Sequence, residues 1–184
     1  MEKQPIETSD LNYESSILSE ENKAKISHYL QLVSQDPSDI EVWTNLGLLF
    51  IQTRNYNKSI ECLNSALSII ASEQEEGNIL RKSKLQNALG VAYFQLGEYS
   101  KAEEYFESVL SIDNNNKDVL NNLGILHTRT GKTKDAINSL LKVLEIDDTD
   151  IHAWENLAEL YRLLGEYDES LRCRMRVLEL SDIK

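Results

Sequence analysis

The stretch NNLGILH at residues 121–127 decides the fold, because the chain repeats it in similar form three more times. The related stretches are TNLGLLF at 44–50, NALGVAY at 87–93 and ENLAELY at 155–161. Gly90, Gly124 and Ala158 follow one another at steps of 34 residues, and Gly47 precedes Gly90 by 43, one such step plus an insertion of nine. A fixed period of this length is typical of repeat proteins.

A second recurring segment follows each of these stretches. It reads GEYSKAEEYFESVLSID from Gly97, GKTKDAINSLLKVLEID from Gly131, GEYDESLRCRMRVLELS from Gly165, and RNYNKSIECLNSALSII from Arg54, where the glycine is missing. The glycines stand where a left-handed residue closes a helix. Asp39 and Asp150 precede the first helices of their units and are predicted N-caps.

The apolar residues recur at helical spacing in both segments. The third unit shows this most clearly, with Leu120, Leu123 and Leu126 in the first segment, then Ala136, Leu140, Val143 and Leu144 in the second. Strands would instead alternate apolar and polar residues. Each unit is therefore predicted to form two helices, which lie close together because the first helix carries a small residue, Gly47, Gly90, Gly124 or Ala158.

A 34-residue helix–turn–helix unit with these letters resembles the tetratricopeptide repeat. The residues that carry the resemblance are Trp43, Leu46, Gly47 and Phe50, then Leu89, Gly90, Tyr93, Ala102 and Phe106, then Leu123, Gly124 and Ala136, then Trp154, Leu157, Ala158 and Tyr161. The family's closing proline is absent, and His127 stands where Tyr or Phe is usual. The resemblance implies an all-α fold, a right-handed superhelical solenoid of antiparallel helix pairs.

The repeat pattern also predicts the domain organisation. We expect one domain over 17–184, with a capping helix at 17–35 and repeats at about 38–72, 82–114, 116–148 and 150–182. Residues 1–16 are expected to be a disordered acidic tail. The polar insertion at 71–84 is expected to lengthen the second helix of unit one and the first helix of unit two.

The composition argues against several classes of function. A net charge of −12 over 184 residues disfavours nucleic acid and anionic lipid as partners. No signal peptide and no membrane-length apolar run are visible in the sequence, so we expect a cytoplasmic protein or, in a eukaryote, a nuclear one. Cys62 and Cys173 are far apart and are expected to be reduced packing residues. Three histidines without a catalytic or metal-binding constellation predict no enzyme, metal or cofactor.

The resemblance places a concave groove along the first helices, and asparagine recurs there. Asn45, Asn122 and Asn156 each precede the leucine of their unit, while Asn87 stands one residue earlier and Ala88 interrupts the series. An asparagine amide can donate to and accept from a peptide backbone. The series is similar to the asparagine ladder of the tetratricopeptide part of the O-linked N-acetylglucosamine transferase. The alternative is that asparagine is simply tolerated at an exposed helical position.

The predicted peptide-binding groove extends beyond the asparagines. Its residues are Asn45, Leu48, Asn87, Val91, Phe94, Asn122, Ile125, Arg129, Asn156 and Glu159. The predicted function is a non-catalytic protein–protein interaction scaffold that binds an extended or helical segment of a partner. Two alternatives stay open: a small acidic chaperone for a secreted or assembly-prone client, and a fragment of a larger repeat protein that self-associates through its C-terminal repeat.

Overall fold

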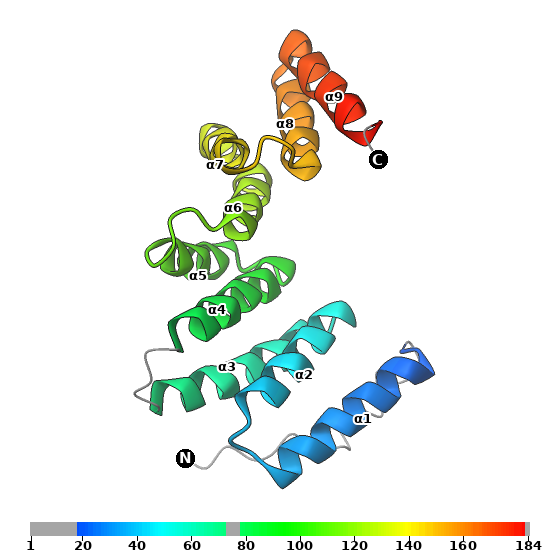
Figure 1. The fold of residues 1–184 in the computed structure, drawn as a ribbon, viewed down its shortest axis with the longest axis vertical. Helices are drawn as coiled ribbons and strands as arrows, with labels where there is room; N and C mark the ends of the chain where they lie inside the picture. The colour runs from blue at the N-terminus through cyan, green and yellow to red at the C-terminus, as the bar shows by residue number, and fades with distance from the viewer. Residues whose placement is uncertain (1–17, 73–77, 183–184) are drawn as a thin grey trace. The chain divides into compact units, whose positions relative to one another are not determined.

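The computed structural model describes residues 18–72 and 78–182, which form nine α-helices and no strand. By compactness the chain divides into two units, Met1–Ala92 and Tyr93–Lys184, and each is described by itself. The first holds α1 (Glu20–Gln35), α2 (Ile40–Gln52), α3 (Tyr56–Ser72) and most of α4 (Asn78–Gln95). The second holds the end of α4, α5 (Tyr99–Leu110), α6 (Lys117–Arg129), α7 (Thr133–Ile146), α8 (Ile151–Leu164) and α9 (Tyr167–Ser181) (Figure 1). The predicted all-α class is confirmed, whereas the predicted tail at 1–16 lies outside the described residues.

The helices pack as the antiparallel pairs that the repeat predicts. In the first unit α2 packs against α3, and α1 covers α2 through Ile26, Tyr29, Leu30 and Val33. In the second unit α6 pairs with α7 and α8 with α9, while α7 also packs against α8. The core of this unit is built from both pairs and includes Leu140, Val143 and Leu157.

Two glycines allow the first and second helices of their pairs to touch. A Cβ atom added to Gly47 would lie 2.8 Å from Leu63 Cγ, and one added to Gly124 would lie 2.8 Å from Leu140 Cγ. Ala158 takes the same position in the last pair, where the residue aligned with Leu140 is the exposed Arg174. An alanine is therefore accommodated where no leucine packs against it.

Left-handed residues close the first helices, as the sequence predicts. Gly97, Gly131 and Gly165 have φ angles of 80°, 74° and 79°. Arg54, aligned with these glycines, has a φ of 61° and is the one described non-glycine residue with a positive value. The turn geometry is therefore retained although the side chain there is an arginine.

The turns before α2 and α8 have the same design. Asp39 and Asp150 cap these helices, accepting hydrogen bonds from backbone N–H groups of the first turn. Trp43 Nε1 donates to the Pro37 carbonyl at 3.0 Å, and Trp154 Nε1 donates to the Asp148 carbonyl at 2.8 Å. Each tryptophan thus ties its helix to the turn that precedes it.

The insertion lengthens two helices, as predicted. α3 and α4 have 17 and 18 residues, and α4 begins at Asn78, ahead of the repeat start expected at 82. Residues 73–77 between them lie outside the described part of the chain. Over the residues that the structure places, no helix is both long and apolar enough to cross a membrane.

Candidate interaction surfaces

In the second unit the predicted groove residues other than Phe94 lie on α6 and α8, which are in contact with each other. Asn122 and Asn156 occupy equivalent positions 34 residues apart and are both half-buried. One turn further along, the equivalent residues Ile125 and Glu159 are exposed, with 38% of Ile125 accessible. We call these four residues the first-helix face. It offers two amides, one apolar side chain and one carboxylate to a ligand.

The charges at the rim of this face are partly neutralised. Arg162 donates to Glu159 Oε1 and Oε2 at 2.6 and 2.8 Å. These hydrogen bonds lower the pKa of the Glu159 carboxyl, and the positive charges of Arg162 and Arg174 lower it further. Arg129 is exposed in the last turn of α6. A ligand would therefore meet a face of mixed charge.

One lysine fixes α6 to the turn that leads into α8. Lys117 Nζ lies 2.7 Å from Asp147 Oδ2 and 3.1 Å from Asp150 Oδ2. Hydrogen bonds from the Lys117 ammonium and from Thr149 lower the pKa of Asp147 to about 2. Since Asp150 also caps α8 through the N–H of Ala153, this network holds the first turns of α6 and α8 together.

The first unit carries the remaining predicted groove residues except Phe94. Leu48 on α2 is 40% exposed, and Asn45 on the same helix is half-buried. Asn87 and Val91 on α4 are also half-buried. Phe94 belongs to the second unit, where its ring centroid lies 5.6 Å from that of Tyr99. The Phe94 ring is therefore already in contact with another side chain of the protein.

His127 is linked to a network that the sequence did not suggest. Its Nε2 lies 3.0 Å from Glu103 Oε1 on α5, and Lys132 Nζ lies 2.7 and 2.8 Å from the two Glu103 oxygens. Hydrogen bonding to Lys132, and secondarily to His127, lowers the pKa of Glu103. The network joins α5 to α6, so His127 contributes to packing between neighbouring repeats.

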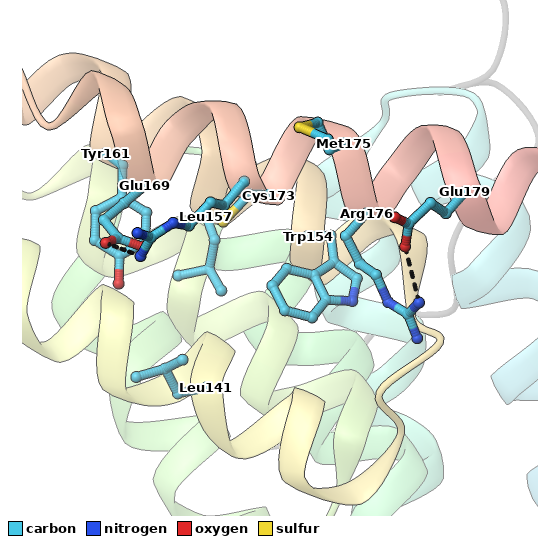
Figure 2. Close-up of a pocket in the computed structure, with 10 residues that line it drawn as sticks. Leu141, Trp154, Leu157, Tyr161, Glu169, Cys173, Met175, Arg176 and Glu179 are labelled. Carbon is cyan, nitrogen blue, oxygen red and sulfur yellow. Dashed lines mark hydrogen bonds and ion pairs between the residues drawn. The ribbon is translucent and has the colours of Figure 1, made fainter.

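A hollow of about 510 Å³ lies among α7, α8 and α9. Figure 2 shows Leu141 on one side, Met175 on the other, and Trp154 and Leu157 between them. Arg176 at the rim pairs with Glu179 at 3.1 Å. The sequence raised self-association through the C-terminal repeat but did not predict this hollow, because its lining comes from three helices.

The two thiols are free and buried. Burial raises the pKa of the Cys62 thiol to about 12 and also raises that of Cys173. Among the residues that the structure describes, no cluster of three His, Cys, Asp or Glu side chains could hold a metal ion.

Helix pairs recur along the chain, and a small residue lies at the contact within each pair. This arrangement defines a helical-repeat protein. Family models described as tetratricopeptide repeat match residues 38–115, 93–157 and 153–184. The chain therefore belongs to the tetratricopeptide repeat family. Its fold and family are those of protein-interaction scaffolds, which are generally non-catalytic.

Known proteins similar to this chain fall into two groups. The human intraflagellar transport protein 88 homolog is 33% identical over 73 residues, 40% of this chain but only 8% of that protein. Among solved structures, MamA from Desulfovibrio magneticus, residues 41 to the end, matches with a TM-score of 0.75 and 13% identity, covering 98% of this chain and 99% of that one. YrrB, described as a TPR protein with an unusual peptide-binding site, matches with a TM-score of 0.64 and 17% identity, covering 92% and 81%. At such identities, these solved structures establish the fold alone.

Proposed function

We propose that this protein is a scaffold that binds an extended or helical peptide segment of a partner on its first helices. The observation that carries the proposal is the repetition on α6 and α8. Asn122 and Asn156 are half-buried, and the side chain one turn after each of them, Ile125 or Glu159, is exposed. A half-buried amide is held in place by its neighbours yet remains partly accessible. Two such amides on adjacent helices can hydrogen-bond an extended peptide backbone independently of its sequence.

The first-helix face can support modest affinity. A neutral hydrogen bond contributes about 0.5–1.5 kcal/mol net, and micromolar binding needs about 8 kcal/mol. The asparagines alone are therefore insufficient, and apolar contact with Ile125 must supplement them, as contact with Leu48 and Val91 would in the first unit. YrrB, which shares the fold, is described by its peptide-binding site, and this favours the same use of the fold here.

The test is selection from a displayed library of peptides, followed by calorimetry of the selected peptides. We expect the Asn45→Ala/Asn122→Ala/Asn156→Ala variant to bind them about tenfold or more weakly than the wild type, with an unchanged helical circular dichroism spectrum. Asn138→Ala is the matched control, because Asn138 is exposed on the second helix α7. Equal affinity of the triple variant and the control would show that the asparagines do not take part in recognition.

The second candidate function is self-association through the C-terminal repeat. The observation in its favour is the exposure of Leu171, Met175 and Leu178 on α9, at 58%, 54% and 65%. Sedimentation over a range of concentrations decides this candidate, because a protein that stays monomeric throughout does not self-associate.

A further inference from the structure

One cation beside the first-helix face has no partner in the described part of the chain. Arg129 is the last residue of α6 and is exposed. Its side chain makes no hydrogen bond or ion pair with any residue that the structure describes. On the same two helices, Lys117 pairs with Asp147. Arg162 pairs with Glu159. Of the lysines and arginines on α6 and α8, Arg129 is therefore the one whose N–H donors are all available to a ligand.

Helical spacing places Arg129 in line with two residues of the first-helix face. Asn122, Ile125 and Arg129 follow one another at steps of three and four residues, so they lie along one side of α6. Ile125 and Arg129 are neighbours on the helix surface. The rise from Asn122 to Arg129 is roughly 10 Å along the helix axis, which the arginine and a peptide side chain can span together. A peptide backbone held at Asn122 would thus present its side chains to Ile125 and Arg129.

The carboxylates on the elements around this end of α6 do not neutralise Arg129. Glu103 on α5 accepts hydrogen bonds from Lys132 through both of its oxygens. Asp135 on α7 and Glu166 after α8 are exposed and form no ion pair with Arg129. The positive charge of Arg129 also interacts favourably with the dipole of α6, but that interaction leaves the guanidinium donors unused.

The opposite end of α6 is acidic. Asp118 is exposed and lies eleven residues before Arg129, on the same side of the helix and roughly 16 Å away along its axis. Near the same end of α8, Glu155 lies 3.4 Å from His152. An acidic side chain of a peptide is therefore repelled at this end and attracted at the Arg129 end. A single free arginine matches a carboxylate, whereas phosphorylated residues are recognised by clusters of arginines.

We propose that the peptide bound by the first-helix face carries an aspartate or glutamate that pairs with Arg129, close to an apolar side chain that covers Ile125. A guanidinium binds a carboxylate through two parallel hydrogen bonds, so this pair fixes which way round the peptide lies on α6. The inference rests on the proposed function, because the peptide backbone must first be held at Asn122. It adds a preference for peptide sequence, which the asparagines alone do not provide.

The test uses peptides selected from a displayed library on the full-length wild-type protein. Their sequences should share one acidic position at a fixed distance from an apolar one. Each selected peptide is then synthesised with the acidic residue, with the corresponding amide and with lysine at that position, and calorimetry measures the affinities. The wild type should bind the acidic form about fivefold tighter than the amide form, as expected for an exposed ion pair. Arg129→Gln should bind these two forms equally, and Arg129→Glu should prefer the lysine form.

A control variant and the asparagine variant separate the possible outcomes. Lys142→Gln removes an exposed positive charge from the second helix α7 and should leave the preference for the acidic form unchanged. Equal binding of the acidic and amide forms by the wild type, or a preference that survives Arg129→Gln, overturns the inference. If Asn45→Ala/Asn122→Ala/Asn156→Ala still weakens binding in that case, the proposed function stands and the acidic preference alone fails. If the triple variant binds as tightly as the wild type, the proposed function fails and this inference fails with it.

Discussion

At the scale of single residues, Arg54 stands where the other three units have a glycine. Its φ of 61° lies in the left-handed region, where a side chain is strained by about 1–2 kcal/mol. We predict that Arg54→Gly raises the free energy of unfolding by up to about 1 kcal/mol, since glycine adopts this geometry without strain but loses more freedom on folding. Urea titration measures the change.

The opposite substitution provides the control for this prediction. Gly131→Ala, with a φ of 74° and open space around a new Cβ, should lower the free energy of unfolding by a comparable amount. A loss of stability in Arg54→Gly would mean that contacts of the arginine side chain outweigh the backbone strain.

The contact between Gly124 and Leu140 gives a second prediction at this scale. A Cβ atom at position 124 would meet Leu140 Cγ at 2.8 Å, so Gly124→Ala should destabilise the protein by about 1–3 kcal/mol. With Leu140→Ala already present the same substitution should be neutral or stabilising, because the clash is gone and alanine favours the helix. A double-mutant cycle by urea unfolding measures the coupling, and additive effects would argue against a steric origin.

At the scale of elements, the junction of α6 with the turn before α8 depends on an ion pair and therefore on pH. The folded pKa of Asp147, about 2, lies below its usual 3.8. The stabilisation from its ionised carboxylate is thus fully present above pH 3.8 and is lost as the pH falls through 2. We predict that Lys117→Met lowers the melting temperature near neutral pH. The difference in melting temperature from the wild type should disappear as the pH falls to about 2.

Thermal unfolding followed by circular dichroism over this pH range checks the prediction. Lys142→Met is the matched control, since Lys142 is an exposed lysine on α7. If the effect of Lys117→Met were the same at every pH, lost side-chain packing and not the ion pair would explain it.

The sequence predicted elements and their contacts where these depend on local geometry. Spacing within one repeat is enough to predict the helix caps at Asp39 and Asp150. It also predicts the left-handed turns at Gly131 and Gly165 and the steric role of Gly124. The Lys117–Asp147 and His127–Glu103 pairs could not be predicted, because they join residues 30 and 24 positions apart whose side-chain directions depend on packing. The exposure of individual groove residues could not be predicted either, because asparagine fits a half-buried position and an exposed one equally well.

At the scale of the whole molecule, the described residues show a tetratricopeptide repeat protein with two kinds of accessible surface. The first-helix face is polar with one apolar side chain, whereas α9 exposes the apolar side chains of Leu171, Met175 and Leu178. Because different helices carry these two sets of residues, substitution of Leu171 and Leu178 is expected to leave peptide binding on the first-helix face intact.

The central claim is that the asparagines of the first helices hold the backbone of a bound peptide. The most direct measurement is nuclear magnetic resonance of the side-chain amide groups of Asn122 and Asn156 while a selected peptide is added, with Asn138 on α7 as the internal reference. The account predicts large shifts of the Asn122 and Asn156 amide signals and none of Asn138. Unshifted Asn122 and Asn156 signals at saturation, with changes confined to α7 and α9, would contradict it.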